Sequence, residues 1–226
     1  MPAKNALKQY AENTYYHLYN RGVDKQNIFR DEQDYGVFLS YLKTYLLPKE
    51  DKKLSLELAN SQIDLQEKNR LLKLLRLNNF NGEIVLVAYC LMPNHFHLLI
   101  KQKSNNSIDK FMRSFGTRYT HYFNKKYHRV GPLYQSVYKA VIVESEEQLL
   151  YLTSYIHRNP LNSRHVILSQ PSSLPEYLDE RNCEWVHPQD ILNYFSKMNH
   201  QLSYQSFITQ SEDLSLIQKI LIDEEM

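Results

Sequence analysis

The sequence predicts an α+β protein of the ferredoxin-like type: an antiparallel sheet with helices packed on one face, plus a helical insert and a helical C-terminal tail. Three observations lead to this prediction. The 226 residues are 42% hydrophobic and 23% charged, a composition typical of globular domains. Short apolar segments alternate along the chain with segments of helical periodicity. The resulting order is strand, helix, helical insert, strand, strand, helix, strand, helix and helical tail, which fits this fold class.

The first part of the chain contains a strand, a helix and the insert. Residues 14–20, TYYHLYN, predict a strand, and Arg21 and Gly22 predict the turn after it. Apolar residues then recur at helical spacing between a cap at Asp31 and a stop at Pro48. Residues 50–80 are rich in leucine and charge and contain no proline or glycine, so we expect a helical hairpin there.

Two neighbouring strands follow the insert. Residues 84–91, IVLVAYCL, form an apolar run typical of a buried strand, and residues 95–101, HFHLLIK, predict the next one. A helix begins at Ser107 with its apolar residues on one stripe.

The last predicted strand covers 138–143. Ser145 and Gln148 form a capping-box pattern that starts a helix, which we expect to end at Asn159 because Pro160 follows. Weaker helical patterns lie near 188–196, 203–210 and 212–222. We therefore expect a catalytic domain over 1–165, with the insert at 50–80, and a helical extension over 166–226.

Charge is distributed unevenly along the chain. Residues 101–140 hold nine Lys or Arg and one Asp, a net charge of +8, whereas 176–226 have a net charge of −7. The basic segment indicates a polyanionic partner. The alternative is that these side chains only solvate helix faces.

Cysteine content and hydropathy indicate the compartment. Cys90 and Cys183 form no CxxC motif and cannot provide a disulfide framework, which favours a reducing environment. No signal-peptide pattern and no apolar run of about 18 residues is present. We expect a soluble, cytoplasmic protein without a membrane partner.

His95 and His97 form the clearest local signal. Side chains alternate along a strand, so these two imidazoles share one face while Phe96, Leu98 and Ile100 point to the core on the other. Two neutral imidazoles in this arrangement suit one metal ion. The alternative is a pair of unrelated surface histidines.

The helix from Ser145 supplies a second candidate group. Leu149, Leu152 and Ile156 form its buried face, and Tyr155 and Asn159 are neighbours on an adjacent stripe. A phenol and an amide oxygen there could serve as nucleophile and metal ligand. The alternative is a tyrosine at the core edge and an asparagine that only ends the helix.

These two groups carry a family resemblance. Residues 91–99, LMPNHFHLL, together with 155–160, YIHRNP, resemble the single-tyrosine HUH transposases, in the branch of REP-associated tyrosine transposases. Weaker matches extend the resemblance over roughly 14–165 and lie at residues 20–22, 27–29, 119–120, 123–124 and 131–135.

The resemblance implies a site and a reaction. His95, His97 and Asn159 would bind a divalent metal, Mg²⁺ or Mn²⁺, and Tyr155 would be the nucleophile. The enzyme would cleave and rejoin single-stranded DNA at hairpin elements through a 5′-phosphotyrosine intermediate, as a monomer or homodimer. The implied DNA-binding residues are basic or amide side chains from three segments: Arg21, Lys110, Arg113, Arg118, Lys125, Lys126, Arg129, Gln135 and Lys139.

Two other functions compete with this one. The first is a catalytically silent, domesticated nucleic-acid-binding protein of the same fold. The second is an RNA-binding ferredoxin-like protein, although no strand carries the aromatic string typical of such proteins. Three segments depart from the family pattern: Val137 replaces an expected arginine, residues 161–167 replace a basic stretch, and the insert is longer than expected.

Overall fold

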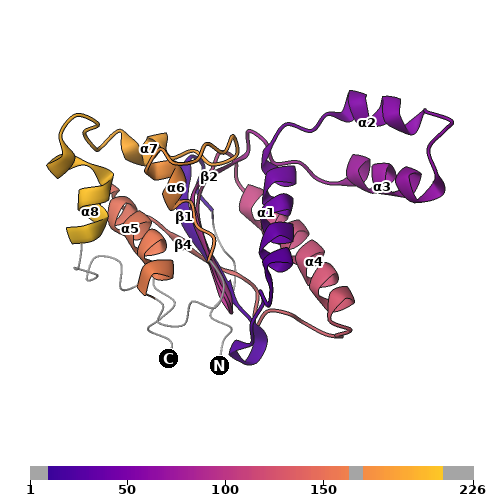
Figure 1. Ribbon diagram of the computed structural model, residues 1–226, viewed down its shortest axis with the longest axis horizontal. Coiled ribbons are helices and arrows are strands. Elements are labelled where there is room, and N and C mark those ends of the chain that lie inside the picture. Colours follow the sequence, from indigo (N-terminus) through magenta and orange to yellow (C-terminus); the bar gives the residue numbers. More distant parts are fainter. Residues whose placement is uncertain (1–9, 163–169, 211–226) are drawn as a thin grey trace.

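The computed structural model describes residues 10–162 and 170–210 and shows one antiparallel sheet between two layers of helices (Figure 1). The four strands are β1 (Thr14–Arg21), β2 (Ile84–Met92), β3 (His95–Gln102) and β4 (Lys139–Ile142). Their order in the sheet is β2-β3-β1-β4, with every neighbouring pair antiparallel. This order confirms the ferredoxin-like α+β prediction.

The longer helices lie where the sequence predicts them, apart from the end of α5. They are α1 (Glu32–Leu46), α4 (Ser107–Lys126) and α5 (Glu146–Asn162), with α2 (Asp51–Leu58) and α3 (Leu65–Arg76) forming the insert. Three short helices follow in the C-terminal part: α6 (Leu174–Tyr177), α7 (Gln189–Leu192) and α8 (Tyr204–Gln210). The pattern near 188–196 therefore becomes only a short helix, and that at 212–222 lies outside the described residues.

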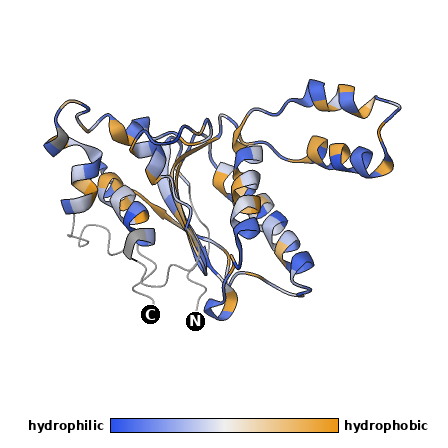
Figure 2. Ribbon diagram, in the orientation of Figure 1, coloured by the Kyte–Doolittle hydropathy of each residue, from blue (hydrophilic) through white to orange (hydrophobic). Residues whose placement is uncertain are grey.

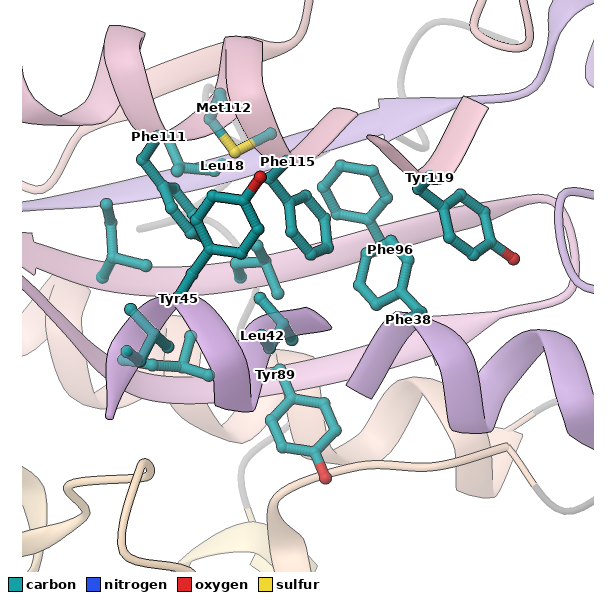
Figure 3. Packing of buried hydrophobic residues seen from close by; sticks show 14 of the residues in the cluster. Leu18, Phe38, Leu42, Tyr45, Tyr89, Phe96, Phe111, Met112, Phe115 and Tyr119 are labelled. Carbon is teal, nitrogen blue, oxygen red and sulfur yellow. The ribbon is translucent and has the colours of Figure 1, made fainter. Parts of the chain in front are cut away.

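One sheet face packs against α1 and α4 through aromatic rings. Phe96, Leu98 and Ile100 of β3 are all buried in this layer, as their alternation predicts. Figure 3 shows Phe38 of α1 meeting Phe96 from the sheet and Phe115 from α4. The Phe38 and Phe115 rings are perpendicular, with centroids 4.6 Å apart, an arrangement that adds stabilisation beyond simple burial.

Helices also cover the opposite face, beyond the single helical layer that the sequence predicts. Val87, Ala88 and Leu99 project there and are fully buried beneath α5 and the short C-terminal helices. The reason lies in β2, whose continuous apolar run places hydrophobic side chains on both faces of the sheet. Each face must then be covered to remove these side chains from water.

The C-terminal segment also covers the free edge of β2. The Leu91 backbone N–H donates to the carbonyl of Pro171 at 2.9 Å, and that of Ser173 donates to the carbonyl of Tyr89 at 3.0 Å. Such pairing satisfies the backbone groups that an edge strand otherwise leaves open. The described part of the tail is thereby tied to the sheet.

Helix ends follow the predicted capping with one exception. Asp31 caps α1 by accepting from the Asp34 N–H at 3.1 Å, and Ser145 Oγ accepts from the Gln148 N–H at 3.1 Å. The predicted end of α5 at Asn159 is wrong, because the helix continues through Pro160 to Asn162. A proline in the last turn removes a single helical hydrogen bond, which the helix tolerates there better than in its middle.

The insert projects away from the sheet. Figure 1 shows α2 and α3 side by side beyond α1 and α4, on the side opposite α5. Figure 2 shows hydrophilic and hydrophobic residues mixed along both insert helices, with hydrophilic residues at the outer end of α4. The insert therefore lies next to α4 and away from α5, the helix that covers His95 and His97.

Candidate active site

His95 and His97 lie together on the sheet face that α5 covers. Their rings are perpendicular, with centroids 4.9 Å apart. His95 is 8% exposed and His97 is fully buried. Their placement confirms that the two imidazoles share a face and contradicts the alternative of unrelated surface histidines.

Hydrogen bonds orient both rings. Nδ1 of His95 lies 2.6 Å from Oδ1 of Asn94. Because an amide oxygen only accepts, Nδ1 donates and the lone pair of His95 is on Nε2. Nδ1 of His97 lies 2.8 Å from Nε2 of His17, a strand residue of β1 whose ring stacks on that of His97.

The remaining nitrogen of His97 suits a metal. Nε2 of His97 is buried and has no hydrogen-bond partner among the described residues, and a buried polar atom in this state needs an explanation. Burial, followed by the nearby His95, His17 and Arg21 side chains, holds the pKa of His97 well below its ordinary value. The ring is therefore neutral at pH 7, the form that binds metals.

Within the described chain, no cluster of three or more His, Cys, Asp or Glu could hold a metal ion. Among the described residues, a protein ligand additional to the two imidazoles would be of another type, such as an amide oxygen. Asn159 has this chemistry and lies on α5, the helix that covers the histidines.

Tyr155 packs directly against this pair. Leu152 and Ile156 are fully buried between α5 and the sheet, and this packing turns the ring of Tyr155 onto His97. The Tyr155 and His97 rings are perpendicular, with centroids 5.6 Å apart. Asn159 lies one turn further along α5, and its Nδ2 donates to the Tyr155 carbonyl at 3.3 Å.

A buried histidine anchors α5. Nδ1 of His157 lies 2.6 Å from the Tyr204 hydroxyl of α8, and Nε2 lies 2.8 Å from the Ser173 hydroxyl. Burial lowers the pKa of His157 to about 3, so this ring stays neutral. Its bonds hold the helix that carries Tyr155 against the C-terminal segment.

The sequence-predicted DNA-binding residues fall into two groups. Arg21 is paired with His95 in the β1–β3 register, and Lys139 is paired with Tyr19, itself opposite His97. The Gln135 backbone N–H donates to the Arg21 carbonyl at 3.0 Å. These three residues therefore lie around the histidine face.

The second group belongs to α4 and the loop after it, on the other side of the sheet. Lys110, Arg113 and Lys125 are exposed on α4, and Arg118 is half-buried. Lys126 instead pairs with Asp31 at 2.6 Å and Asp34 at 2.8 Å. Arg129 bonds Oδ1 of Asn124 at 3.0 Å. The structure thus brings Tyr155, His95 and His97 together and places the α4 cations elsewhere.

Sequence reasoning misses His17 and Asn94 as site residues. The alternation of the first strand contains a signal for His17, because residues 15, 17, 19 and 21 share a face. That face meets the His97 face only through strand pairing, which the local pattern does not specify. Asn94 is predicted only as a turn residue.

Comparisons with known proteins find similarity to transposases. The family model of the IS200-like transposases matches residues 54–159. The solved structure of a REP-associated tyrosine transposase bound to a REP hairpin is similar over 82% of this chain and 98% of that chain, with a TM-score of 0.50 and 9% identity. A Deinococcus radiodurans protein described as a candidate transposase is similar over 70% of this chain and 96% of that chain, with a TM-score of 0.36 and 15% identity. No curated protein matches the chain significantly.

The matched segment contains both histidines, Tyr155 and Asn159, and the described fold is shared with a tyrosine transposase. This part of the chain is thus similar to transposases, a class of enzymes that process DNA. The match to the IS200-like transposases covers just under half of the chain, residues 54–159. No helix in the described ranges is long and apolar enough to cross a membrane.

Proposed function

We propose that this protein is a transposase that cleaves and rejoins single-stranded DNA at hairpin elements through a covalent bond to Tyr155. One observation carries the proposal: the ring of Tyr155 packs on that of His97, 5.6 Å between centroids, although 58 positions separate them in the chain. A phenol next to two imidazoles places a nucleophile beside a candidate metal site. The likeness to a transposase of the REP-associated branch supports the choice of a hairpin substrate.

The residues present fit a divalent metal. The lone pair of His95 is on Nε2, and Nε2 of His97 has no partner among the described residues. His95, His97 and the amide oxygen of Asn159 would hold Mg²⁺ or Mn²⁺. When bound, the metal would supply stabilisation of the charge that develops on the scissile phosphate.

Tyr155 carries the covalent step. Its oxygen forms a bond to phosphorus while the bond from phosphorus to the 3′ oxygen breaks, and the phenolic proton passes overall to that 3′ oxygen. The products are a 5′-phosphotyrosine and a free 3′-OH. Because one phosphoester replaces another, the step needs no ATP and its reverse rejoins the strands.

The neighbouring residues hold these groups in position. With a metal on Nε2 of His97, His17 would accept the Nδ1 proton of His97 and hold the ring in that tautomer. Arg21 and Lys139, beside His95 and Tyr19 in the strand register, would contact the phosphates that flank the cut. Buried apolar contacts of α5 keep the phenol on the imidazoles.

Metal removal tests the reaction. Incubation with Mn²⁺ and a labelled single-stranded hairpin should give a denaturant-resistant protein–DNA adduct, which a chelator abolishes and added Mn²⁺ restores. His97→Ala should give no adduct with Mn²⁺, and its DNA affinity should fall only modestly because phosphate contacts dominate affinity. Denaturing gels and fluorescence anisotropy measure the two quantities.

Two results would contradict this assignment. Adduct that forms in excess chelator would make the reaction metal-independent. Absence of adduct with every hairpin tested, in a folded protein that binds DNA, would favour a catalytically silent relative. His187→Ala, a change at an exposed histidine between α6 and α7, serves as the control and should react like the wild type.

His17 should affect metal affinity without touching the metal. His17→Leu removes the acceptor for the Nδ1 proton of His97, and loss of such a partner typically lowers metal affinity about 10–100-fold. Titration of Mn²⁺ by calorimetry, with circular dichroism to verify folding, measures this change. If folded His17→Leu binds Mn²⁺ as tightly as the wild type, His17 has only a packing role and does not orient His97 for the metal.

A further inference from the structure

The insert and the outer side of α4 enclose a large groove. This α1–α3–α4 groove has a volume of about 1220 Å³ and is lined by three helices. Its cationic lining residues come from two walls: Arg70 and Lys73 from α3, and Lys110, Arg113, Arg118, Lys125 and Lys126 from α4. Among the described residues, no aspartate or glutamate lines it. A groove with charge of one sign on both walls attracts a polyanion.

Several of these cations are not neutralised by the protein. Arg70, Arg113 and Lys126 pair with Glu67, Asp109 and Asp31, respectively. Lys73, Lys110 and Lys125, by contrast, form no ion pair with any residue that the structure describes. The exposed cations therefore lie on both the insert and α4.

Arg118 lies in the groove wall and is held in place by a stacking contact. Its guanidinium carbon lies 3.8 Å from the ring centroid of Tyr41, so the group stacks on the tyrosine. Nη1 of Arg118 is buried and has no hydrogen-bond acceptor in the described part of the chain. Arg118 therefore keeps an unpaired N–H donor in the wall of the groove, and guanidinium N–H groups are well suited to bind phosphate.

The spacing of the charges indicates a long ligand. Lys110 and Lys125 are 15 residues apart on α4, which corresponds to about 22 Å along the helix axis. About six base pairs of B-form DNA span this length at 3.4 Å each. A small phosphate compound is too short to contact both Lys110 and Lys125.

The aromatic residues of the groove favour duplex DNA over a single strand. Sites for single strands present open aromatic faces on which bases stack. Here Tyr45 is fully buried, the ring of Tyr41 is covered by Arg118, and the Tyr122 hydroxyl donates to Asp34 at 2.9 Å. The groove therefore presents positive charge along its length, and none of these three aromatic rings has a free face on which a base could stack.

We propose that the α1–α3–α4 groove binds the sugar–phosphate backbone of a DNA duplex, with the insert as its second wall. The groove lies on the α1–α4 side of the sheet, whereas His95, His97 and Tyr155 lie on the α5 side. The duplex would accordingly be a part of the substrate other than the strand that is cut. This inference rests on the proposed DNA-processing function and assigns a role to the insert.

A blunt DNA duplex without single-stranded ends tests the groove separately from cleavage. Binding is measured by fluorescence anisotropy in chelator, over a range of salt concentrations. Loss of one phosphate contact should flatten the slope of log K against log salt by about 0.9. Lys73→Ala and Lys125→Ala should each show this change, and the double variant should show roughly twice as much.

Lys68→Ala is the matched control, since Lys68 is also exposed on α3 but does not line the groove. Its slope should equal that of the wild type. A wild-type slope in folded Lys73→Ala would overturn the role of the insert, and binding of single strands but not of the duplex would overturn the choice of ligand. Because the assay contains neither metal nor a cleavable strand, these outcomes are independent of whether Tyr155 forms an adduct.

Discussion

Replacing Tyr155 with phenylalanine is expected to abolish the covalent protein–DNA adduct. The change removes the one oxygen that would bond to phosphorus and keeps the ring that packs on His97. DNA affinity should remain close to that of the wild type, because contacts to backbone phosphates supply most of it. Denaturing gels with labelled hairpin DNA and Mn²⁺ measure the adduct, and anisotropy measures binding.

Tyr151→Phe provides the matched control on the same helix. Tyr151 packs against Phe207, with ring centroids 5.6 Å apart, and lies one turn before Tyr155. This variant should form adduct at the wild-type level. Adduct that persists in Tyr155→Phe would move the nucleophile to another residue and refute the proposed chemistry.

Asp34→Ala is expected to cause the largest loss of stability. The Asp34 side chain is fully buried, and its oxygens accept from Lys126 at 2.8 Å, Tyr122 at 2.9 Å and Tyr127 at 2.8 Å. Removing one partner of a buried, hydrogen-bonded ion pair typically costs about 3–5 kcal/mol. Here Lys126 keeps only its ion pair with the half-exposed Asp31. The Tyr122 and Tyr127 hydroxyls also lose their bonds to Asp34. For a chain of this size the melting temperature should fall by roughly 6–20 °C.

Asp31 offers a graded comparison at the same cluster. Its side chain is 49% exposed, so water replaces much of what Asp31→Ala removes. The remaining loss is that of the helix cap, typically about 1 kcal/mol. Both variants are compared by thermal and urea unfolding. Equal destabilisation would show that the burial of Asp34 is not the cause of the large loss of stability expected for Asp34→Ala.

Much of the site is predictable because its signals are local. Alternation along residues 95–101 places His95 and His97 on one face and Phe96 on the other, as the structure confirms. Helical periodicity likewise directs Leu152 and Ile156 to the sheet, which determines where Tyr155 points. Each of these inferences depends only on backbone geometry within one element.

Other features depend on how distant elements pair. His17 contacts His97 because β1 lies between β3 and β4, and strand order follows from the packing of the whole sheet. The C-terminal segment covers β2 through bonds to Leu91 and Tyr89 that no local pattern in either segment predicts. The groove of the insert also exists only because α3 folds beside α4.

The amino-acid sequence by itself determined the type and order of the main elements, the shared face of the two histidines and the candidate nucleophile. Hydrophobic periodicity and capping act over a few residues, so they can be read directly. Only the tertiary structure decided that helices cover both sheet faces, that α5 runs past Pro160, and that the α4 cations lie away from the histidines. These outcomes depend on burying apolar surface between segments far apart in the chain, and that free energy belongs to the assembled fold.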